Sequence, residues 1–344
     1  MDLYDLHAAI RDGSLSRVPR EALTSARLTA RNASGNTPFH VFAKNGWLRD
    51  LPPAVLTAEN FWVKNDAGYT PLHHAAIGGH LDQVPPALLT EDTLGARSNA
   101  GITVLHLAAA HGHLDQVPPA LLTSEAVLRK TDVGNTLLHE AAENGTLDRV
   151  PRHFITAETL ALKNVGGETV LHVAAFNGHL AQLARIAPEL LTTAALRETT
   201  SGGDTVFHAA AISGHLEQIP AELLTHDNLV ITTKTGFTAI HAAAETGQLS
   251  KIPRQVLTAQ LLLTRNDNGD TPLHAAAYEG HLLQVPRELL TRESVGARNY
   301  DGVSVAKTAS DRGFHEQIPA EVRPRVMSPL RRFLHNLGHT RGPF

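Results

Sequence analysis

Histidine is the residue type in this sequence with the widest chemical reach, because the chain has 21 histidines and no cysteine. Imidazoles bind metal ions and carry protons, and zinc sites often combine several of them. Nine histidines recur at intervals of 33 residues, with one interval of 36, and we call them the repeat histidines: His7, His40, His73, His106, His139, His172, His208, His241 and His274. In stacked repeats such residues would lie about 10 Å apart, which is too far to share one ion. We therefore predict a structural role and no metal site.

Other motifs that carry catalysis or bind cofactors are missing from the sequence. The glycine-rich dinucleotide loop, the phosphate loop and the Gly-x-Ser-x-Gly nucleophile pattern do not occur. Carboxylate pairs such as Glu140 and Glu143 have i, i+3 spacing, which is typical of a solvated helix face. We predict that the protein is not an enzyme, has no catalytic residues and needs no cofactor.

The elements that position the repeat histidines can be read from the residues around them. Thr70 and Pro71 supply a helix cap and a first helical residue, and small alanines follow His73 where a neighbour must approach. Gly79 is suited to the left-handed residue that ends such a helix, and Asn65–Gly68 predicts a turn before it. The equivalent glycines mark ten units: Gly13, Gly46, Gly79, Gly112, Gly145, Gly178, Gly214, Gly247, Gly280 and Gly313.

The pattern Gly-x-Thr-Pro-Leu-His-x-Ala-Ala-x-x-Gly-His-Leu with a 33-residue period resembles the ankyrin repeat. The closest matches are residues 68–81 and 269–282, and the resemblance extends over about residues 1–320. It implies an all-α solenoid of about ten units, each formed by two antiparallel helices and a hairpin-like finger turn. We therefore expect one continuous array over residues 1–320.

The second half of each unit departs from the usual ankyrin pattern because proline interrupts it. Proline disfavours helical geometry in the residue before it. In the unit that contains His73 we predict a one-turn helix over Leu81–Val84, a break, a short helix from Pro85 or Pro86, and a third turn capped by Thr90. The sixth unit has three extra residues and no proline in this place, so its second helix should continue to about Ala187.

The resemblance also implies where a partner would bind. Ankyrin arrays bind partners on a concave side formed by the finger tips and the first helix. Residues after the Ala-Ala pair and in the fingers differ between units, and several are aromatic or aliphatic although aromatics are only 5% of the chain. The predicted partner-binding residues are Tyr69, Ile77, Ile102, His111, Glu143, Phe176, Ile212, Phe237, Glu245, Tyr278 and Tyr300.

Charge divides the chain into two parts. The net charge is −4, whereas residues 321–344 carry +4, so the remainder carries −8. Leu330, Phe333 and Leu334 share one helical face, which favours a capping helix in residues 321–344 over a nucleic-acid contact. The arginines that would make such a basic tail contact are Arg323, Arg325, Arg331 and Arg332.

Together these features predict a non-catalytic protein-protein interaction module that binds a partner with basic and apolar surface. Two alternatives stay open: an inhibitor or effector that blocks another protein or sequesters a small ligand, and a nucleic-acid contact through the arginine-rich tail. The near-neutral charge does not favour nucleic-acid binding. The sequence has no signal peptide or membrane-spanning run, so we expect a cytoplasmic monomer without a membrane contact.

Overall fold

The computed structural model describes residues 6–7 and 23–323 of the 344-residue chain. It divides into two compact units, Met1–Ile219 and Pro220–Phe344, each of which is described by itself. Within the described residues both units are helical and contain no β-strand. Isolated antiparallel bridges such as Arg97–Thr103 close some of the finger turns. The expected continuous array over residues 1–320 stays a prediction, and most of the expected capping segment lies outside the described residues.

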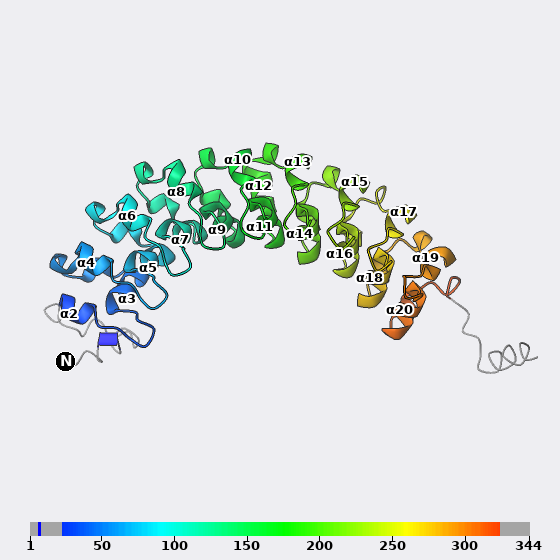
Figure 1. The fold of residues 1–344 in the computed structure, drawn as a ribbon, viewed down its shortest axis with the longest axis horizontal. Helices are drawn as coiled ribbons and strands as arrows, with labels where there is room; N and C mark the ends of the chain where they lie inside the picture. The colour runs from blue at the N-terminus through cyan, green and yellow to red at the C-terminus, as the bar shows by residue number, and fades with distance from the viewer. Residues whose placement is uncertain (1–5, 8–22, 324–344) are drawn as a thin grey trace, which may run out of the picture. The chain divides into compact units, whose positions relative to one another are not determined.

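Each repeat begins with a helix of seven or eight residues that contains the repeat histidine position. In the first unit these helices lie side by side (Figure 1): α3 (Pro38–Asn45), α5 (Pro71–Gly78), α7 (Val104–Ala110), α9 (Leu137–Asn144), α11 (Val170–Phe176) and α14 (Val206–Ser213). In the second unit they are α16 (Ala239–Glu245), α18 (Pro272–Glu279) and α20 (Val305–Asp311). The predicted signals are confirmed in α5, where Thr70 is the N-cap, Pro71 is the first residue and Gly79 has φ +72°.

Alanine and leucine make the contacts between neighbouring first helices. Ala75 and Ala76 of α5 are fully buried, and so is Leu81 in the element that follows. The small alanine side chains let adjacent helices approach closely, while the leucines fill the layer between a repeat and its neighbour. This thin layered core explains why the chain needs few aromatic residues.

The second half of most repeats consists of two 3₁₀ turns joined by two residues, of which the second is the recurring proline. In the first unit the turns before the proline break are η3 (Leu48–Asp50), η5 (Leu81–Gln83), η7 (Leu114–Gln116), η9 (Leu147–Arg149) and η12 (Leu216–Gln218). Those after it are η4 (Pro53–Val55), η6 (Pro86–Leu88), η8 (Pro119–Leu121) and η10 (Arg152–Phe154), and η11 (Pro188–Leu190) follows the second helix of the repeat that lacks this proline. In the second unit the two sets are η14 (Leu249–Lys251), η15 (Leu282–Gln284) and η17 (His315–Gln317), and η13 (Ala221–Leu223) and η16 (Arg287–Leu289). Val84 is extended because Pro85 follows it, so η5 is one residue shorter than the predicted helix and has 3₁₀ geometry.

A third, short α-helix completes most repeats and begins after a recurring threonine. Thr90 accepts a hydrogen bond from the backbone N–H of Thr93 at 3.2 Å, as expected for a helix cap. These helices are α2 (Ser25–Leu28), α4 (Ala58–Phe61), α6 (Glu91–Leu94), α8 (Ser124–Leu128), α10 (Ala157–Leu160) and α13 (Thr193–Leu196) in the first unit, and α15 (His226–Leu229), α17 (Ala259–Leu262) and α19 (Arg292–Gly296) in the second.

The repeat with three extra residues has the longer second helix that its sequence predicts. Helix α12 (Leu180–Ile186) is α-helical throughout, and Ala187 is its C-cap. It packs against η9 of the preceding repeat, with Leu180 and Leu183 fully buried. Without a proline in this place, the chain continues the helix for about two turns.

Candidate partner-binding surface

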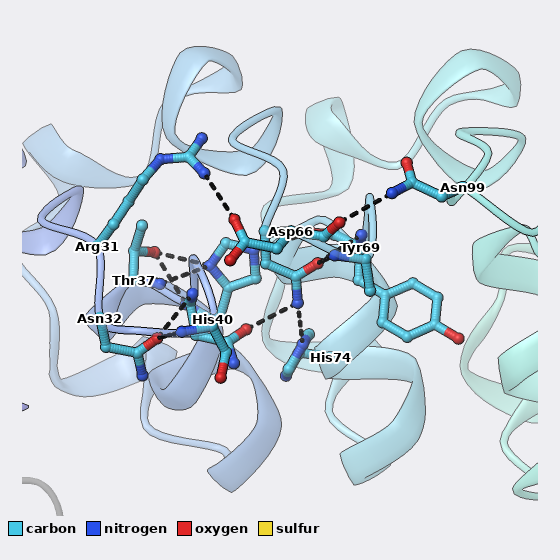
Figure 2. Close-up of polar contacts among 12 residues, drawn as sticks. Arg31, Asn32, Thr37, His40, Asp66, Tyr69, His74 and Asn99 are labelled. Atoms are coloured by element: carbon cyan, nitrogen blue, oxygen red, sulfur yellow. Dashed lines mark hydrogen bonds and ion pairs between the residues drawn. The ribbon is translucent and has the colours of Figure 1, made fainter.

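The repeat histidines control the position of the finger residues from which the surface is built. In the second described repeat, the backbone N–H of Thr70 donates to Nδ1 of His73 at 3.0 Å. Nε2 therefore carries the proton and donates to the carbonyl oxygen of Ile102 in the next repeat, at 3.2 Å. Figure 2 shows the same arrangement one repeat earlier, with His40 between Thr37 and Tyr69. Each such histidine links the start of its own helix to the finger of the following repeat.

Burial favours the neutral imidazole in His40, His73 and His106, as their hydrogen bonds require. It lowers the pKa of His40, His73 and His106 to about 4, against the weaker opposing effect of their backbone hydrogen bonds. Both ring nitrogens of these three residues have hydrogen-bond partners within the protein. In the described part of the chain, no group of three or more metal-ligating side chains is placed to hold an ion.

The finger turns form a second link between repeats. Asn65 accepts hydrogen bonds from the backbone N–H groups of Ala67 and Tyr69, at 3.1 and 2.9 Å. At the finger tips, Asp66 N–H donates to the carbonyl of Ser34, and Asn99 donates from its side-chain amide to the carbonyl of Asp66 (Figure 2). This backbone pairing fixes the fingers, so the side chains they present have defined positions.

Two repeat positions present most of the predicted residues. The finger position, just after the turn glycine, contains Tyr69, Ile102 and Phe237, and all three are half-buried. The helix-end position, just after the Ala-Ala pair, contains Ile77, Glu143, Phe176, Ile212, Glu245 and Tyr278; Ile77 is half-buried and the other five are exposed. His111 is exposed one residue beyond the helix-end position, and Tyr300 is exposed at a finger tip.

In the first unit, Phe176 and Ile212 line one hollow of about 430 Å³. Their side chains are 53% and 44% exposed, which is unusual for large apolar residues. Two carboxylates at the finger position, Glu168 and Asp204, line the same hollow. Asn164 donates a hydrogen bond to Glu168 at 2.8 Å, and Thr200 donates one to Asp204 at 3.1 Å.

In the second unit, Phe237, Glu245 and Tyr278 line a hollow of about 350 Å³. Asp270 and Glu279 join them, so two aromatic rings and three carboxylates share one concavity. The Nε2 atom of His241 lies 3.0 Å from the carbonyl oxygen of Asp270, and its ring lies 5.3 Å from that of Phe237. The repeat histidine His241 therefore contacts two residues that line the hollow, Asp270 and Phe237.

The sequence analysis selected Glu245 but missed the other four carboxylates of the two hollows, Glu168, Asp204, Asp270 and Glu279, because it selected mainly apolar residues. Glu168, Asp204 and Asp270 occupy the same finger position as the selected Tyr69, Ile102 and Phe237. That shared position was the signal that could have identified them. Glu279 follows Tyr278 directly and has no such pattern.

The remaining predicted residues do not join either hollow: Tyr69, Ile77, Ile102, His111, Glu143 and Tyr300. Burial raises the pKa of the Tyr69 hydroxyl, and the negative charge of Glu140 raises it further. Glu140 is less solvated than its spacing suggested, because it is half-buried and accepts a hydrogen bond from Asn135 at 3.1 Å. Burial accordingly raises the pKa of Glu140, whereas Glu143 is exposed.

Of the four arginines predicted to make a basic tail contact, Arg323 lies within the described residues. Arg323 donates to the carbonyl oxygens of Ile318 and Glu316, at 2.7 and 2.9 Å, and forms an ion pair with the carboxylate of Glu316. These contacts attach it to the end of the last repeat. Arg325, Arg331 and Arg332 lie outside the described residues.

Comparison with protein-family models decides the family. A model for three copies of the ankyrin repeat matches residues 49–129 and 171–257, and a model for a single ankyrin repeat matches residues 268–300. These segments cover more than half of the chain. The chain belongs to the ankyrin repeat family. Its 3₁₀ turns and short third helices are therefore a variant of the second half of an ankyrin unit.

A search of curated proteins finds no match to this ankyrin repeat protein. Ankyrin repeats are generally protein-protein interaction modules and typically non-catalytic. None of the helices in residues 6–7 and 23–323 has the length and apolar character that a membrane crossing requires.

Proposed function

We propose that this ankyrin repeat protein is a non-catalytic binding module that holds a partner protein on the surface formed by its helix-end and finger positions. The observation that carries the proposal is the gathering of Phe176 with Ile212, and of Phe237 with Tyr278, into hollows beside carboxylates. Exposed apolar side chains surrounded by polar groups are typical of protein interfaces. The carboxylates favour a partner with basic as well as apolar residues.

The repeat framework supports this proposal energetically. Because the repeat histidines and finger hydrogen bonds fix the backbone before any partner arrives, binding would require little ordering of this chain. Variable side chains on a fixed scaffold can then supply specificity without any catalytic step. We expect the aromatic and branched residues of the two hollows to contribute most of the binding energy.

The proposal is tested by affinity capture with the full-length chain and the variant F176A/I212A/Y278A. The matched control is W62A/L128A/L283A, which removes three exposed apolar side chains that do not line either hollow. Partners are identified by mass spectrometry and then titrated as purified proteins. We expect the first variant to weaken binding at least tenfold and the control to bind as the unaltered chain does. Equal affinity of both variants for each purified partner would refute the assignment of the surface.

A further inference from the structure

We propose that the hollow of the second unit binds the side chain of an arginine presented by a partner protein. This inference rests on the proposed protein-binding function and names the residue that the second unit would recognise. The hollow combines negative charge with aromatic surface.

The hollow is lined by three carboxylates, none of which forms an ion pair among the described residues. Glu245 and Glu279 are exposed at its edge, and neither forms an ion pair among the described residues. Asp270 accepts a hydrogen bond from the side-chain amide of Asn299 at 2.8 Å, which leaves its net charge unchanged. The nearby Lys307 is paired with Asp311 on the same helix. A cationic group entering the hollow would therefore meet three carboxylates.

The aromatic part of the hollow already carries one guanidinium. The central carbon of the Arg312 guanidinium lies 3.9 Å from the centroid of the Tyr278 ring, and Arg312 Nε donates to the Tyr278 carbonyl at 3.0 Å. This contact fixes Tyr278, whose side chain stays 49% exposed, and shows that a guanidinium is accommodated on its ring. Phe237 supplies a second ring on the lining.

Arginine satisfies this combination better than lysine does. Its planar guanidinium stacks on aromatic rings and binds carboxylates in a bidentate manner, whereas an ammonium group is a compact and strongly hydrated charge. A hollow of about 350 Å³ is large enough to admit one long side chain. The geometry therefore favours a partner segment that inserts one arginine.

The hollow of the first unit serves as an internal comparison. It has two carboxylates, Glu168 and Asp204, where the second hollow has three, and Ile212 occupies the helix-end position that Tyr278 occupies in the second hollow. It has no cation stacked on Phe176 among the described contacts. We therefore assign arginine recognition to the second unit alone.

The experiment measures fluorescence anisotropy of a labelled peptide, Gly-Ser-Leu-Arg-Leu-Ser-Gly, titrated with the full-length chain. A peptide with citrulline in place of arginine is isosteric but uncharged and is the ligand control. We expect the arginine peptide to bind at least tenfold more tightly than the citrulline peptide. We also expect E245Q/E279Q to lose at least tenfold in affinity, and E222Q/E293Q, which removes two exposed carboxylates on other faces of the second unit, to bind normally. Circular dichroism checks that all variants are folded.

Equal binding of the two peptides, or equal binding by E245Q/E279Q and the unaltered chain, would overturn the arginine assignment. A further arm uses R331Q/R332Q in the full-length chain, for which we expect unchanged affinity. Tighter peptide binding by that variant would assign the hollow to the chain's own tail and overturn the choice of a partner arginine. A purified partner that is lost with F176A/I212A/Y278A but retained with E245Q/E279Q would uphold the proposed function and refute this inference.

Discussion

The Nε2 atom of His40 lies 2.9 Å from the carbonyl oxygen of Tyr69, so the imidazole of one repeat supports the finger residue of the next. The same bond recurs along the first unit from His73 to Ile102 and from His139 to Glu168. The accepting carbonyl belongs each time to the finger position, whose side chain varies. The histidine framework thus keeps the backbone constant while the surface chemistry changes.

This relationship predicts that H73A destabilises the first unit strongly. The substitution leaves the Thr70 N–H and the Ile102 carbonyl without their partner and opens a cavity in a fully buried site. We expect the free energy of unfolding to fall by about 2–4 kcal/mol. Urea denaturation followed by circular dichroism measures it. The exposed His153 provides a matched control, and H153A should change stability by less than about 0.5 kcal/mol. Equal losses for the two variants would contradict the role assigned to His73.

A second prediction concerns the stability of the folded protein at acidic pH. Burial lowers the pKa of His40, His73 and His106 to about 4 and that of His74 to about 3, below the ordinary value of 6.5. Between pH 6.5 and about 4, the unfolded chain therefore binds more protons than the folded chain does. The stabilising effect of these histidines is complete above pH 6.5 and decreases as the pH falls. Each contributes up to about 1.4 kcal/mol per pH unit in this range.

His74 allows this prediction to be tested residue by residue. Its Nδ1 atom is buried without a hydrogen-bond partner, and its ring packs against that of His40 at 5.1 Å between centroids. We expect H74Q to reduce the slope of unfolding free energy against pH by up to about one proton near pH 5 and to leave the slope almost unaltered at pH 7.5, and we expect H153A to leave the slope unchanged throughout. An unaltered slope in H74Q would show that His74 is protonated in the folded protein.

The local features of each repeat were predictable because the residues that decide them are adjacent in the chain. Thr70, Pro71 and Gly79 fix the first helix through capping, and Pro85 fixes the break. The longer α12 also follows from a local absence of proline. The partner of His73 was not predictable from spacing, because the accepting carbonyl of Ile102 lies 29 residues away and carries no side-chain signature.

The candidate surface was predictable in part for the same reason. Phe176, Ile212, Phe237 and Tyr278 could be selected because apolar side chains at variable positions are conspicuous in sequence. Glu279 and Asp270 belong to the candidate surface because packing of adjacent repeats brings them into one hollow. The sequence alone does not show this packing. Charged residues are normally solvated, so their type alone gave no reason to select them.

A third prediction compares two glycines with the same backbone geometry. Gly145 and Gly214 both have positive φ, but a Cβ at Gly145 would lie 2.8 Å from the ring of His179, whereas one at Gly214 would meet no atom of the described part of its own unit within 4 Å. Both G145A and G214A should lower the free energy of unfolding by about 1 kcal/mol because of the left-handed backbone. G145A should cost at least about 1 kcal/mol more because the imidazole must move. Equal unfolding free energies of the two variants would show that contact with the His179 ring does not affect stability.

The last prediction concerns Gln116, which joins two repeats through both atoms of its amide. Its Nε2 donates to the carbonyl of Gly79 at 2.7 Å, and its Oε1 accepts from the N–H of Leu81 at 2.9 Å. Gln182 makes the same pair of contacts to Gly145 and Leu147, so the interaction survives where α12 replaces the 3₁₀ turn.

Because Gln116 satisfies two backbone groups at once, we expect Q116A to lower the free energy of unfolding by about 1–3 kcal/mol. Q116E should be at least as harmful, because a carboxylate oxygen replaces the donor that faces the Gly79 carbonyl. Hydrogen exchange of the Leu81 amide measures the local effect, and that amide should exchange faster in both variants. The exposed Gln255 is the control, and Q255A should leave stability and exchange unchanged. If Leu81 stays protected in Q116A, the contact between these repeats does not depend on the glutamine.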